Sequence, residues 1–524
     1  MPKSIISLYN PTKPGTVYCQ KCWWGDGWDW SGYGQDYDFS RPFFEQFAEL
    51  QEKVPKLAMV NDDGVSSINC EYTQDFSYSK NCYMVFVAWK VENSAYNYYI
   101  TSGKEIYDSL HSMGECESVY ETIWTEKCYR CRFVYYSAAL ADCSFCYDCR
   151  DCSDCFMSVG LRHKRYYFKN QQYTKEEYER IISEYRLNTW SGIEKAKAEL
   201  AEFKLKYPRK SSLMRNCVNC TGDYLINGKN AKLCFGVLRA EDCKWIENAD
   251  TPKDCYDLSI GGELSQCYEG ITPDHSALNR FSIFSWKNTD VFYVDACHSC
   301  QNVFGCVGLR KGKYCILNRQ YSKEEYEALL LKIKTQMDEM PYVDKNGNTY
   351  RFGEFFPAPL SYFAYNASAA QDSIPLEQTD AEKQGFTWQD GAGMTRGKET
   401  VRAIPETIAE VPDDIIKDIL ACAQCGRNYR IVPQELEFYR KMNIPLPRRC
   451  FYCRHSERMS QRNPFKLWTR QCDCNGKVST NGLFNNTAVH AHGDSRCPNV
   501  FETTYAPDRP EIVYCENCYN SEIA

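Results

Sequence analysis

The sequence predicts a mainly β fold with accessory helices, built around a duplicated, cysteine-rich β-solenoid, which is a short parallel β-helix. Two observations predict it: cysteines recur at intervals of twelve residues through two long blocks, and the second block repeats a pattern found at the end of the first. One interval would form one rung, and stacked rungs lie about 4.8 Å apart. An all-α bundle is the weaker alternative, because these segments show no sustained period of 3.6 residues.

The twelve-residue interval appears in both blocks. Asn or Asp often precedes the cysteine, and these side chains are suited to corners, after which the cysteine can point inward. The cysteines in register are Cys70 and Cys82; Cys116 and Cys128; Cys131, Cys143 and Cys155; and Cys243, Cys255 and Cys267. We therefore expect them to form ladders inside each solenoid.

An internal repeat at an offset of 148 residues indicates that the chain is duplicated. The matching positions lie in Gly160–Arg162 and Gly308–Arg310, and in Asn170–Tyr178 and Asn318–Tyr326. Both copies contain a capping box of the kind that opens a helix, Thr174 with Glu177 and Ser322 with Glu325. Each block should therefore end in an amphipathic helix that packs against it.

The composition indicates a folded, cytoplasmic protein. The 524 residues include 31 cysteines, and in a reducing compartment metal binding is a more common use of so many thiols than disulfides. Hydrophobic residues make up 43% of the chain, too many for a disordered protein. The net charge of −7 excludes a protein coated with basic residues for bulk binding of nucleic acid. With no signal-peptide pattern and no long apolar run, we expect no membrane span.

The ladder cysteines have two interpretations. Sulfurs around a tetrahedral zinc lie about 3.8 Å apart, less than the rung spacing of about 4.8 Å, so one cysteine per rung does not form a site. Packing is therefore the favoured role, and a metal or redox role is the alternative. One run resembles the start of a bacterial ferredoxin motif, although Phe156 stands where its proline would follow. That run is Cys143, Cys146, Cys149, Cys152 and Cys155, and weaker pairs are Cys217 with Cys220 and Cys297 with Cys300.

Two C-x-x-C pairs farther along the sequence predict a closed zinc site. Its four ligands would be Cys422, Cys425, Cys450 and Cys453. Four thiolates leave no open position on the metal, which predicts a structural role for the zinc. The segment 422–454 resembles a small zinc ribbon whose second pair has the pattern Arg-Cys-x-x-Cys-Arg, present here from Arg449 to Arg454.

A second zinc site should follow in the same region. We expect it to use Cys472, Cys515 and Cys518, with a fourth ligand from Cys474, Cys497, His490 or His492. The segment ending at Cys518 is matched at an offset of 496 by one ending at Cys22, so Cys19 and Cys22 form half of a zinc unit. Two thiolates bind zinc poorly. The pair is either a metal-free remnant packed against Trp23 and Trp24, which we favour, or takes ligands from elsewhere, such as another chain.

The chain as a whole resembles an uncharacterised cysteine-rich, zinc-ribbon-bearing family of ultra-small uncultured bacteria. The resemblance covers nearly all of residues 1–390. The segments that carry it are Cys19–Trp24, Asp38–Phe47, Lys206–Lys210 and the repeated Gly-Leu-Arg and Gln-Tyr motifs. Family members carry a full ribbon ahead of the pair that matches Cys19 and Cys22, and this sequence has none there. The resemblance implies the architecture and no particular activity.

Other segments predict covers and connections. Ser40 is a candidate N-cap for a helix from Phe43 to Leu50, which we expect to cover the open end of the first solenoid. The nearby tryptophans Trp23, Trp24, Trp28 and Trp30 form either a packed cluster, which we favour, or a stacking platform for bases or sugars. A helix over 191–206 should lead to the second block. The predicted boundaries are 1–65 for the half zinc unit and capping helix, 66–213 and 214–340 for the two solenoid repeats with their helices, 341–418 for an extended linker with little core, and 419–524 for the zinc-ribbon domain.

A basic face is predicted just after the second C-x-x-C pair. Between Cys425 and Gln471 the sequence has eleven Lys or Arg against three Glu. Arg454, Arg458 and Arg462 recur at intervals of four and would share one helix face. That face is either solvated or binds phosphates of RNA or DNA.

These observations favour a binding protein over an enzyme. The seven histidines accompany no nucleophile motif, and no phosphate-binding glycine loop appears. The first hypothesis is a zinc-binding scaffold that docks on a protein or nucleic-acid partner, such as RNA, the ribosome or DNA, through its basic ribbon. The second is a metal- or redox-handling protein that uses the cysteine ladders. The third is a polysaccharide-acting β-helix enzyme, for which the sequence shows no acidic cleft.

Overall fold

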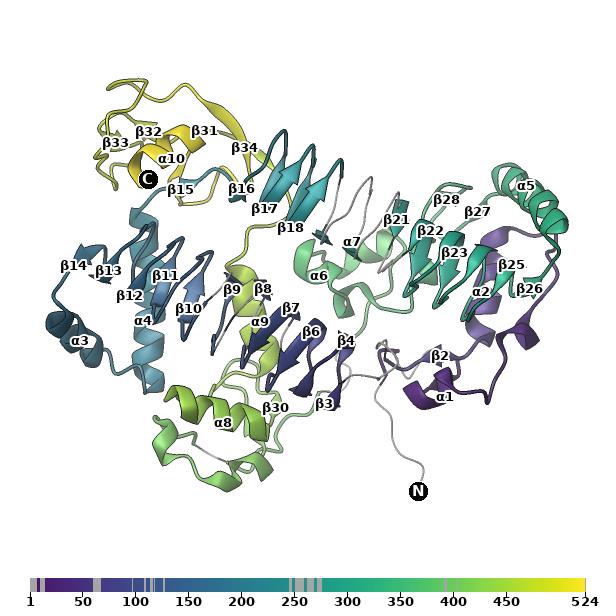
Figure 1. Cartoon of the computed structure of the whole chain (residues 1–524), viewed down its shortest axis with the longest axis horizontal. Helices are drawn as coiled ribbons and strands as arrows, with labels where there is room; N and C mark the ends of the chain where they lie inside the picture. Colours follow the sequence, from purple (N-terminus) through teal and green to yellow (C-terminus); the bar gives the residue numbers. More distant parts are fainter. Residues whose placement is uncertain are drawn as a thin grey trace.

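The structure is a computed structural model that describes residues 7–9, 15–59, 67–96, 98–107, 110–113, 116, 118–125, 128–244, 247–249, 259–261, 268–270, 276–390, 394–401 and 403–523. Within these residues, ten α-helices and many short strands form a mixed α/β protein (Figure 1). The strands are concentrated in the two blocks predicted from the cysteine pattern, and the helices lie around them.

The strands of the first block pair in chain order as one sheet (Figure 1). They are β3 (Ile68–Glu71), β5 (Lys80–Tyr83), β6 (Phe86–Glu92), β7 (Tyr98–Lys104), β8 (Leu110–Met113), β9 (Ile123–Thr125), β10 (Arg132–Tyr135), β11 (Ser144–Tyr147), β12 (Ser153–Phe156) and β13 (Arg165–Phe168), while β4 (Gln74–Ser77) pairs with β6. These pairings are parallel.

Most neighbouring strands are offset by twelve residues, and the described residues between them form no helix. Cys70 pairs with Cys82, and Val134 pairs with Cys146. A single bridge between Ala138 and Arg150 repeats the interval. The chain therefore stacks on itself once per predicted rung, and one turn takes an extra residue, so that Leu110 pairs with Ile123.

Left-handed backbone recurs at every third residue of these turns. From Arg130 to Lys169 each third position has a positive φ, for example 49° at Asp142 and 55° at Phe145. A turn of twelve residues therefore contains four such bends. At five consecutive bends, the residue directly after the bend is a buried cysteine. This accounts for the run Cys143, Cys146, Cys149, Cys152 and Cys155. Asp and Asn tolerate this conformation better than most residues, which explains their frequent place before cysteine.

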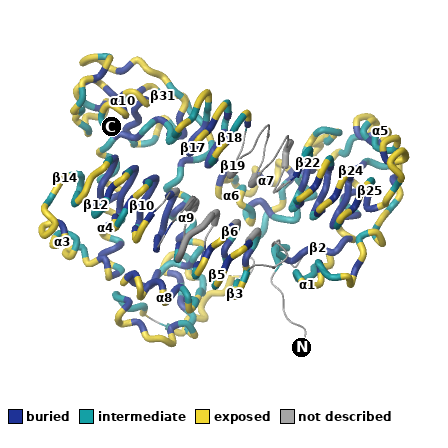
Figure 2. Tube along the Cα trace, viewed as in Figure 1, coloured by how far each residue is buried: buried dark blue, intermediate teal, exposed yellow. Residues whose placement is uncertain are grey.

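Small side chains fill the inside of the turns, and aromatic side chains lie outside. The inner cluster contains the ladder cysteines from Cys82 to Cys155 with Val, Ala, Leu and Ile. Phe133, Phe145 and Phe156 belong to a separate cluster that includes Ala196 and Leu200 of the helix α4 (Trp190–Phe203). Buried residues follow the strands of both blocks in Figure 2. The predicted inward direction is thus confirmed for the ladder cysteines from Cys82 to Cys155, whereas Cys70 is only partly buried against the cluster.

The second block continues the same stacking. Its described strands form two groups, and Gly222 pairs with Cys234 and Val291 with Val303 at the twelve-residue offset. The groups are β16 (Met214–Arg215), β17 (Gly222–Lys229), β18 (Cys234–Glu241), β19 (Glu247–Ala249) and β20 (Ser259–Gly261); and β21 (Tyr268–Gly270), β22 (Ala277–Ile283), β23 (Thr289–Asp295), β24 (Gln301–Phe304), β25 (Lys313–Ile316) and β26 (Arg319–Gln320). Cys243 is buried as predicted, whereas Cys255 and Cys267 lie outside the described residues.

The two blocks end in the same local structure. Asn170 accepts a hydrogen bond from the Val159 amide at 2.8 Å and donates one to the Val159 carbonyl at 2.7 Å. Asn318 makes the same pair with Val307, at 2.9 and 2.8 Å. The helices α3 (Lys175–Glu184) and α5 (Lys323–Glu339) follow, each opened by the predicted capping box. A short strand precedes each capping box. In the first copy it is β14 (Gln171–Gln172), which pairs with β13, and in the second it is β26, which pairs with β25.

The helix α2 (Phe43–Lys53) covers the second block, not the first (Figure 1). The Phe43 ring lies 5.3 Å from Tyr293 and 5.0 Å from Phe304, and Gln51 donates to Asp295 at 2.9 Å. The expected cover of the first block was wrong because the sequence pattern shows which face of a helix is apolar and not which surface it meets. Ser40 is also not the N-cap; Pro42 holds that position.

The glycine of each Gly-Leu-Arg motif lies where a covering segment approaches closely. Gly308 has a φ of +70°, and a Cβ there would lie 2.9 Å from Val54 Cγ1. Gly160 has a φ of +69°, and a Cβ would lie 3.0 Å from Ile523 Cδ1. The first block is thus covered by a late segment of the chain and the second block by an early one.

The stretch 341–418 has more core than predicted. Phe356 is buried in the cluster of the second block, and Ile408, Val411 and Ile415 are buried in the cluster of the first. The Tyr362 hydroxyl donates to Asp295 at 2.7 Å. Its prolines and glycines interrupt regular structure but do not prevent burial, and the segment packs against both blocks.

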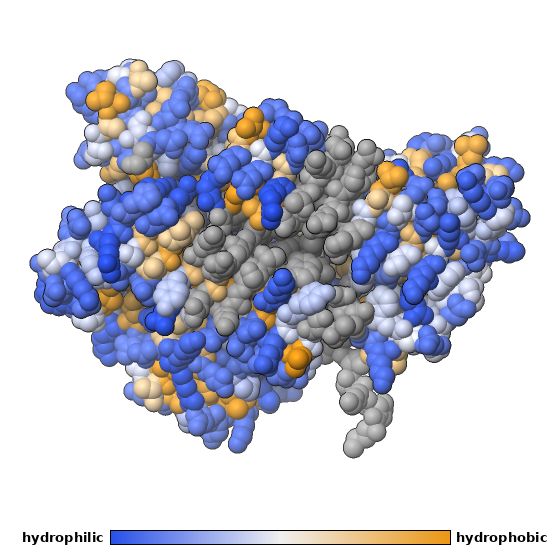
Figure 3. Space-filling view, viewed as in Figure 1, coloured by the Kyte–Doolittle hydropathy of each residue, from blue (hydrophilic) through white to orange (hydrophobic). Residues whose placement is uncertain are grey.

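Hydrophilic residues dominate the described surface on the face shown in Figure 3, where hydrophobic residues form small separate groups. Among the described helices, none combines the length and the apolar character needed to cross a bilayer.

We predict that Asn318→Ala destabilises the protein more than Asn170→Ala. Asn318 is fully buried, so its loss leaves an amide and a carbonyl of Val307 without partners, at about 1–3 kcal/mol for each group. Asn170 is partly exposed, and water can replace its side chain. Thermal unfolding of both variants tests this, and an equal or reversed order would contradict the proposed role of burial.

Candidate metal centres

The structure brings the four cysteines of the first predicted zinc site together. Their sulfurs all lie within 4.8 Å of one another, and Cys425 Sγ is 3.8 Å from Cys450 Sγ. That separation matches the roughly 3.8 Å between sulfurs of a tetrahedral zinc site. Cys422 and Cys425 lie between the paired strands β29 (Leu420–Ala421) and β30 (Asn428–Tyr429), and Cys450 and Cys453 lie at the start of α9 (Phe451–Ser460).

Backbone amides favour the thiolate form of Cys422, whereas burial raises the pKa of Cys450 and Cys453. Burial alone would raise the pKa of Cys422, but amides of Cys425 and Cys450 lower that pKa to about 6. The Cys450 amide donates to Cys422 Sγ at 3.3 Å. A thiolate is the form in which cysteine binds a metal.

The module around these cysteines packs on the first block. The Phe451 ring stacks on Tyr96 at 5.1 Å, and Phe438 of α8 (Pro433–Met442) lies 4.0 Å from Tyr107. Arg132 donates to the Met442 carbonyl at 2.6 Å. A metal here would stabilise a module that covers the aromatic outer layer of the turns.

The predicted basic face, expected to be either solvated or phosphate-binding, is mostly turned inward, so neither alternative holds for Arg454 and Arg458. The side chains of Arg454 and Arg458 are 4% and 2% exposed. Arg454 lies 3.5 Å from the buried carboxylate of Glu435, and Arg462 donates to Ser373 at 3.2 Å. In Figure 1, α9 lies between the first block and the segment that holds α6 (Ala370–Ser373). Arg462 lies beyond the end of α9, so the four-residue interval placed only Arg454 and Arg458 on one helix face, and it did not predict their burial.

The second predicted site is also assembled, and Cys497 is its fourth ligand candidate. The sulfurs of Cys472, Cys497, Cys515 and Cys518 all lie within 4.8 Å of one another. Cys497 Sγ is 3.9 Å from Cys515 Sγ, and the Cys515 amide donates to Cys472 Sγ at 3.2 Å. The surrounding elements are β31 (Trp468–Gln471), β32 (Cys474–Asn475), β33 (Val478–Ser479), β34 (Val500–Thr503), β35 (Val513–Tyr514) and α10 (Glu516–Ile523).

The remaining candidates form a third group. Ligand atoms of Cys474, His490, His492 and Cys518 lie within 4.8 Å of one another. His492 Nε2 is 3.4 Å from Cys518 Sγ. The sequence offered Cys474, Cys497, His490 and His492 as alternatives for one position, whereas the structure places Cys497 in one group and the other three in another.

Cys19 and Cys22 repeat the backbone of the C-terminal site but not its ligands. β1 (Val17–Tyr18) pairs in parallel with β2 (Lys56–Leu57), as β35 pairs with β15 (Arg209–Lys210). Within the described residues, neither cysteine belongs to a group of three possible metal ligands. The choice between a metal-free remnant and ligands from another chain remains a prediction.

The tryptophans after Cys22 pack on the second block. Trp23 and Trp28 are buried, and Arg310 of the second Gly-Leu-Arg motif donates to their carbonyls at 3.1 and 3.2 Å. The Arg310 guanidinium also lies 5.0 Å from the Trp28 ring. This arginine is a positioning residue that the sequence pattern marked only as part of a repeat.

The ladder cysteines behave as packing residues. The thiol of Cys143 lies within hydrogen-bond distance of the Ala141 and Cys152 carbonyls, at 3.3 and 3.5 Å. Burial raises the pKa of Cys306, which disfavours its thiolate. No ladder cysteine of the described residues belongs to any of the three ligand groups.

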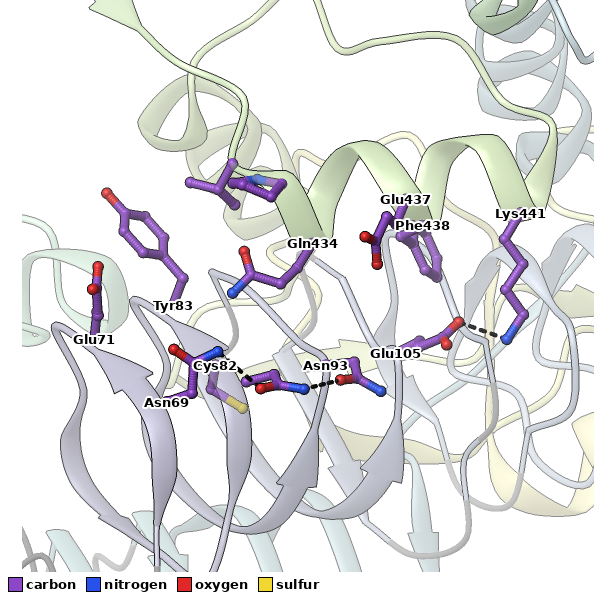
Figure 4. Close-up of a pocket in the computed structure, with 13 residues that line it drawn as sticks. Asn69, Glu71, Cys82, Tyr83, Asn93, Glu105, Gln434, Glu437, Phe438 and Lys441 are labelled. Atoms are coloured by element: carbon purple, nitrogen blue, oxygen red, sulfur yellow. Dashed lines mark hydrogen bonds and ion pairs between the residues drawn. The ribbon is translucent and has the colours of Figure 1, made fainter. Parts of the chain in front are cut away.

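A cleft of about 610 Å³ lies between the first turns and α8 (Figure 4). Along one wall, Asn69 donates to Asn81 at 2.9 Å and Asn81 donates to Asn93 at 2.8 Å. Lys441 pairs with Glu105 at 2.9 Å across the far end. The described lining is largely polar, with three asparagines and the carboxylates of Glu71, Glu105 and Glu437.

No model of a known protein family matches the sequence, and no curated protein is similar to it. The sites themselves therefore carry the functional argument.

We predict that Cys450→Ser removes one zinc ion per chain and lowers the thermal midpoint. A weaker oxygen ligand replaces a thiolate in a closed site, whose metal stabilises the fold. Elemental analysis of the purified full chain measures the loss. The matched control is Cys146→Ala, which removes a fully buried ladder sulfur and should leave the zinc content unchanged. Loss of metal from the control, or none from Cys450→Ser, would contradict the assignment.

We predict that Arg454→Ala destabilises the protein by about 3–5 kcal/mol, because Glu435 then stays buried without its cationic partner. Arg430→Ala is the control, since this neighbouring arginine is exposed. Denaturant unfolding followed by tryptophan fluorescence compares them. Equal stability of the two variants would show that the buried pair does not contribute as argued.

Proposed function

We propose that this protein is a zinc-binding scaffold, in which metal-bound modules hold two cysteine-packed β-solenoids together so that they can serve as a surface for a binding partner. The proposal rests on one observation: the module with the C-terminal cysteines contacts both blocks. Tyr519 donates to Asp148, and the hydroxyls of Tyr505 and Tyr147 lie 3.2 Å apart, on the first block. Thr504 donates to Asp223 of the second.

Further contacts support the bridging role. Thr503 donates to the Ser211 carbonyl at 2.6 Å, and the Phe465 ring stacks on Phe235 at 5.0 Å. Burial raises the pKa of Asp223 to about 6, although hydrogen bonds from Thr504 and backbone amides oppose that rise. A buried carboxyl needs its hydrogen-bond partners, so this contact fixes the position of the C-terminal module relative to the second block.

The donor chemistry favours zinc. Groups of four soft thiolates suit zinc or iron, and closed zinc sites of this kind act on folding. The burial of the ladder thiols in a narrow core and their contacts with carbonyls favour packing over the alternative, a metal- or redox-handling protein.

Metal removal tests the proposal. A strong chelator should lower the thermal midpoint of the full chain and raise amide exchange in 468–523 and at the junction residues 211–235. Zinc should restore both, and magnesium, which prefers oxygen ligands, should not. A chain that purifies without metal, or whose exchange is unchanged by chelation, would contradict the scaffold proposal.

A further inference from the structure

We infer that the C-terminal module holds two zinc ions in one cluster, bridged by the thiolate of Cys518. The inference rests on the proposed zinc binding and adds a second ion to one site. Cys518 belongs both to the group of four cysteines and to the group with Cys474, His490 and His492. The two groups contain seven different residues. Two tetrahedral ions require eight bonds, and the seven residues supply them if Cys518 binds both ions.

The shared sulfur keeps the ions close. Each zinc–sulfur bond is about 2.3 Å, so two ions on one thiolate lie less than about 4.6 Å apart. Cys518 lies in α10 one turn after Cys515, and both side chains are buried. The start of α10 therefore presents the Cys515 sulfur to the group of four cysteines and the Cys518 sulfur to both groups.

Hydrogen bonds orient both histidines as metal ligands. His490 Nε2 lies 2.8 Å from Glu522, and the side chains of this pair are 2% and 0% exposed. Glu522 also accepts from the Thr487 and Ala488 amides, at 2.9 and 3.2 Å, so its position is set. A carboxylate on one ring nitrogen is the usual support for a histidine that binds metal through the other.

His492 is held in the same way from the opposite ring nitrogen. Its Nδ1 lies 2.8 Å from the Ser495 carbonyl oxygen, which can only accept a hydrogen bond, so Nδ1 carries the ring proton and donates it in this bond. This fixes the tautomer in which Nε2 carries a lone pair, and Nε2 is the atom that faces Cys518 Sγ. A single zinc site that lacked only its fourth ligand would need one histidine. Two histidines, each oriented by its own hydrogen bond, therefore favour a second ion.

Charge also favours two ions. Five thiolates around one divalent zinc would leave a net charge of about −3 in a buried site, which is costly. Two zinc ions reduce it to about −1, because the two histidines bind as neutral ligands. Amides donate to the remaining sulfur charge: Asn486 to Cys474 at 3.2 Å and Asn499 to Cys515 at 3.4 Å.

Zinc counting in the full chain tests the inference. Native mass spectrometry and elemental analysis should find three zinc ions per chain, one in the Cys422 site and two in the cluster. His492→Ala and Cys497→Ser should each lose one ion, whereas Cys518→Ser should lose two. The matched control is Cys22→Ser, which changes the equivalent cysteine of the N-terminal half unit and should lose none.

Cobalt substitution gives a second readout that does not depend on the variants folding. Two cobalt ions on one thiolate couple magnetically, so the moment per cobalt should fall as the cluster fills. Two zinc ions per chain, with no loss in His492→Ala and no magnetic coupling, would overturn the cluster while leaving the scaffold proposal intact. A metal-free chain would overturn both.

Discussion

The left-handed bend at every third residue is the constraint on which the rest of the structure depends. Four bends in a turn of twelve residues leave a narrow interior that admits one small side chain after each bend. Cysteine suits this position because it is small, and its thiol reaches a backbone carbonyl of the next turn, as Cys146 does to Cys155 at 3.5 Å. Aromatic residues at the bends point away from this interior, so each block needs an outer cover.

The covers bring the metal groups to their places. α8 and α9 lie on the aromatic side chains of the first block and belong to the module with Cys422 and Cys450. β15 follows α4 in the chain and pairs with β35, the strand that directly precedes Cys515 of the C-terminal module. The same protein therefore uses cysteine in two ways: inside the turns as packing, and in the covers as metal ligands.

Local signals in the sequence predicted the elements well. The twelve-residue register, both capping boxes and the four cysteines from Cys422 to Cys453 depend on short-range spacing, and the structure agrees with each. The run from Cys143 to Cys155 remained ambiguous, because a step of three residues is shared by a metal knuckle and by a turn that bends every third residue. Positive φ at residues such as Phe145 leaves no clear trace in composition.

Long-range relations were harder to predict. The interval from Arg454 to Arg458 identified a helix face, whereas Arg462 follows the helix. The burial of this region depends on the segment 341–418 and on the first block, which lie far away in sequence. In the same way, the sequence did not show which block α2 covers or which candidate joins Cys472, Cys515 and Cys518. A helix or ligand carries a pattern that shows what kind of contact it makes, and only the folded chain shows with which partner.

The reciprocal covers affect the order in which the chain can fold during synthesis. Residues 17–57 leave the ribosome before the block they cover, which is complete only after Asn318. The first block waits in turn for Tyr519 and Ile523. The early cover is therefore made with exposed aromatic side chains before its block exists, and the first block is made before its late cover; in this interval association between unfinished chains competes with folding. Chaperone capture of nascent chains would be concentrated in that interval.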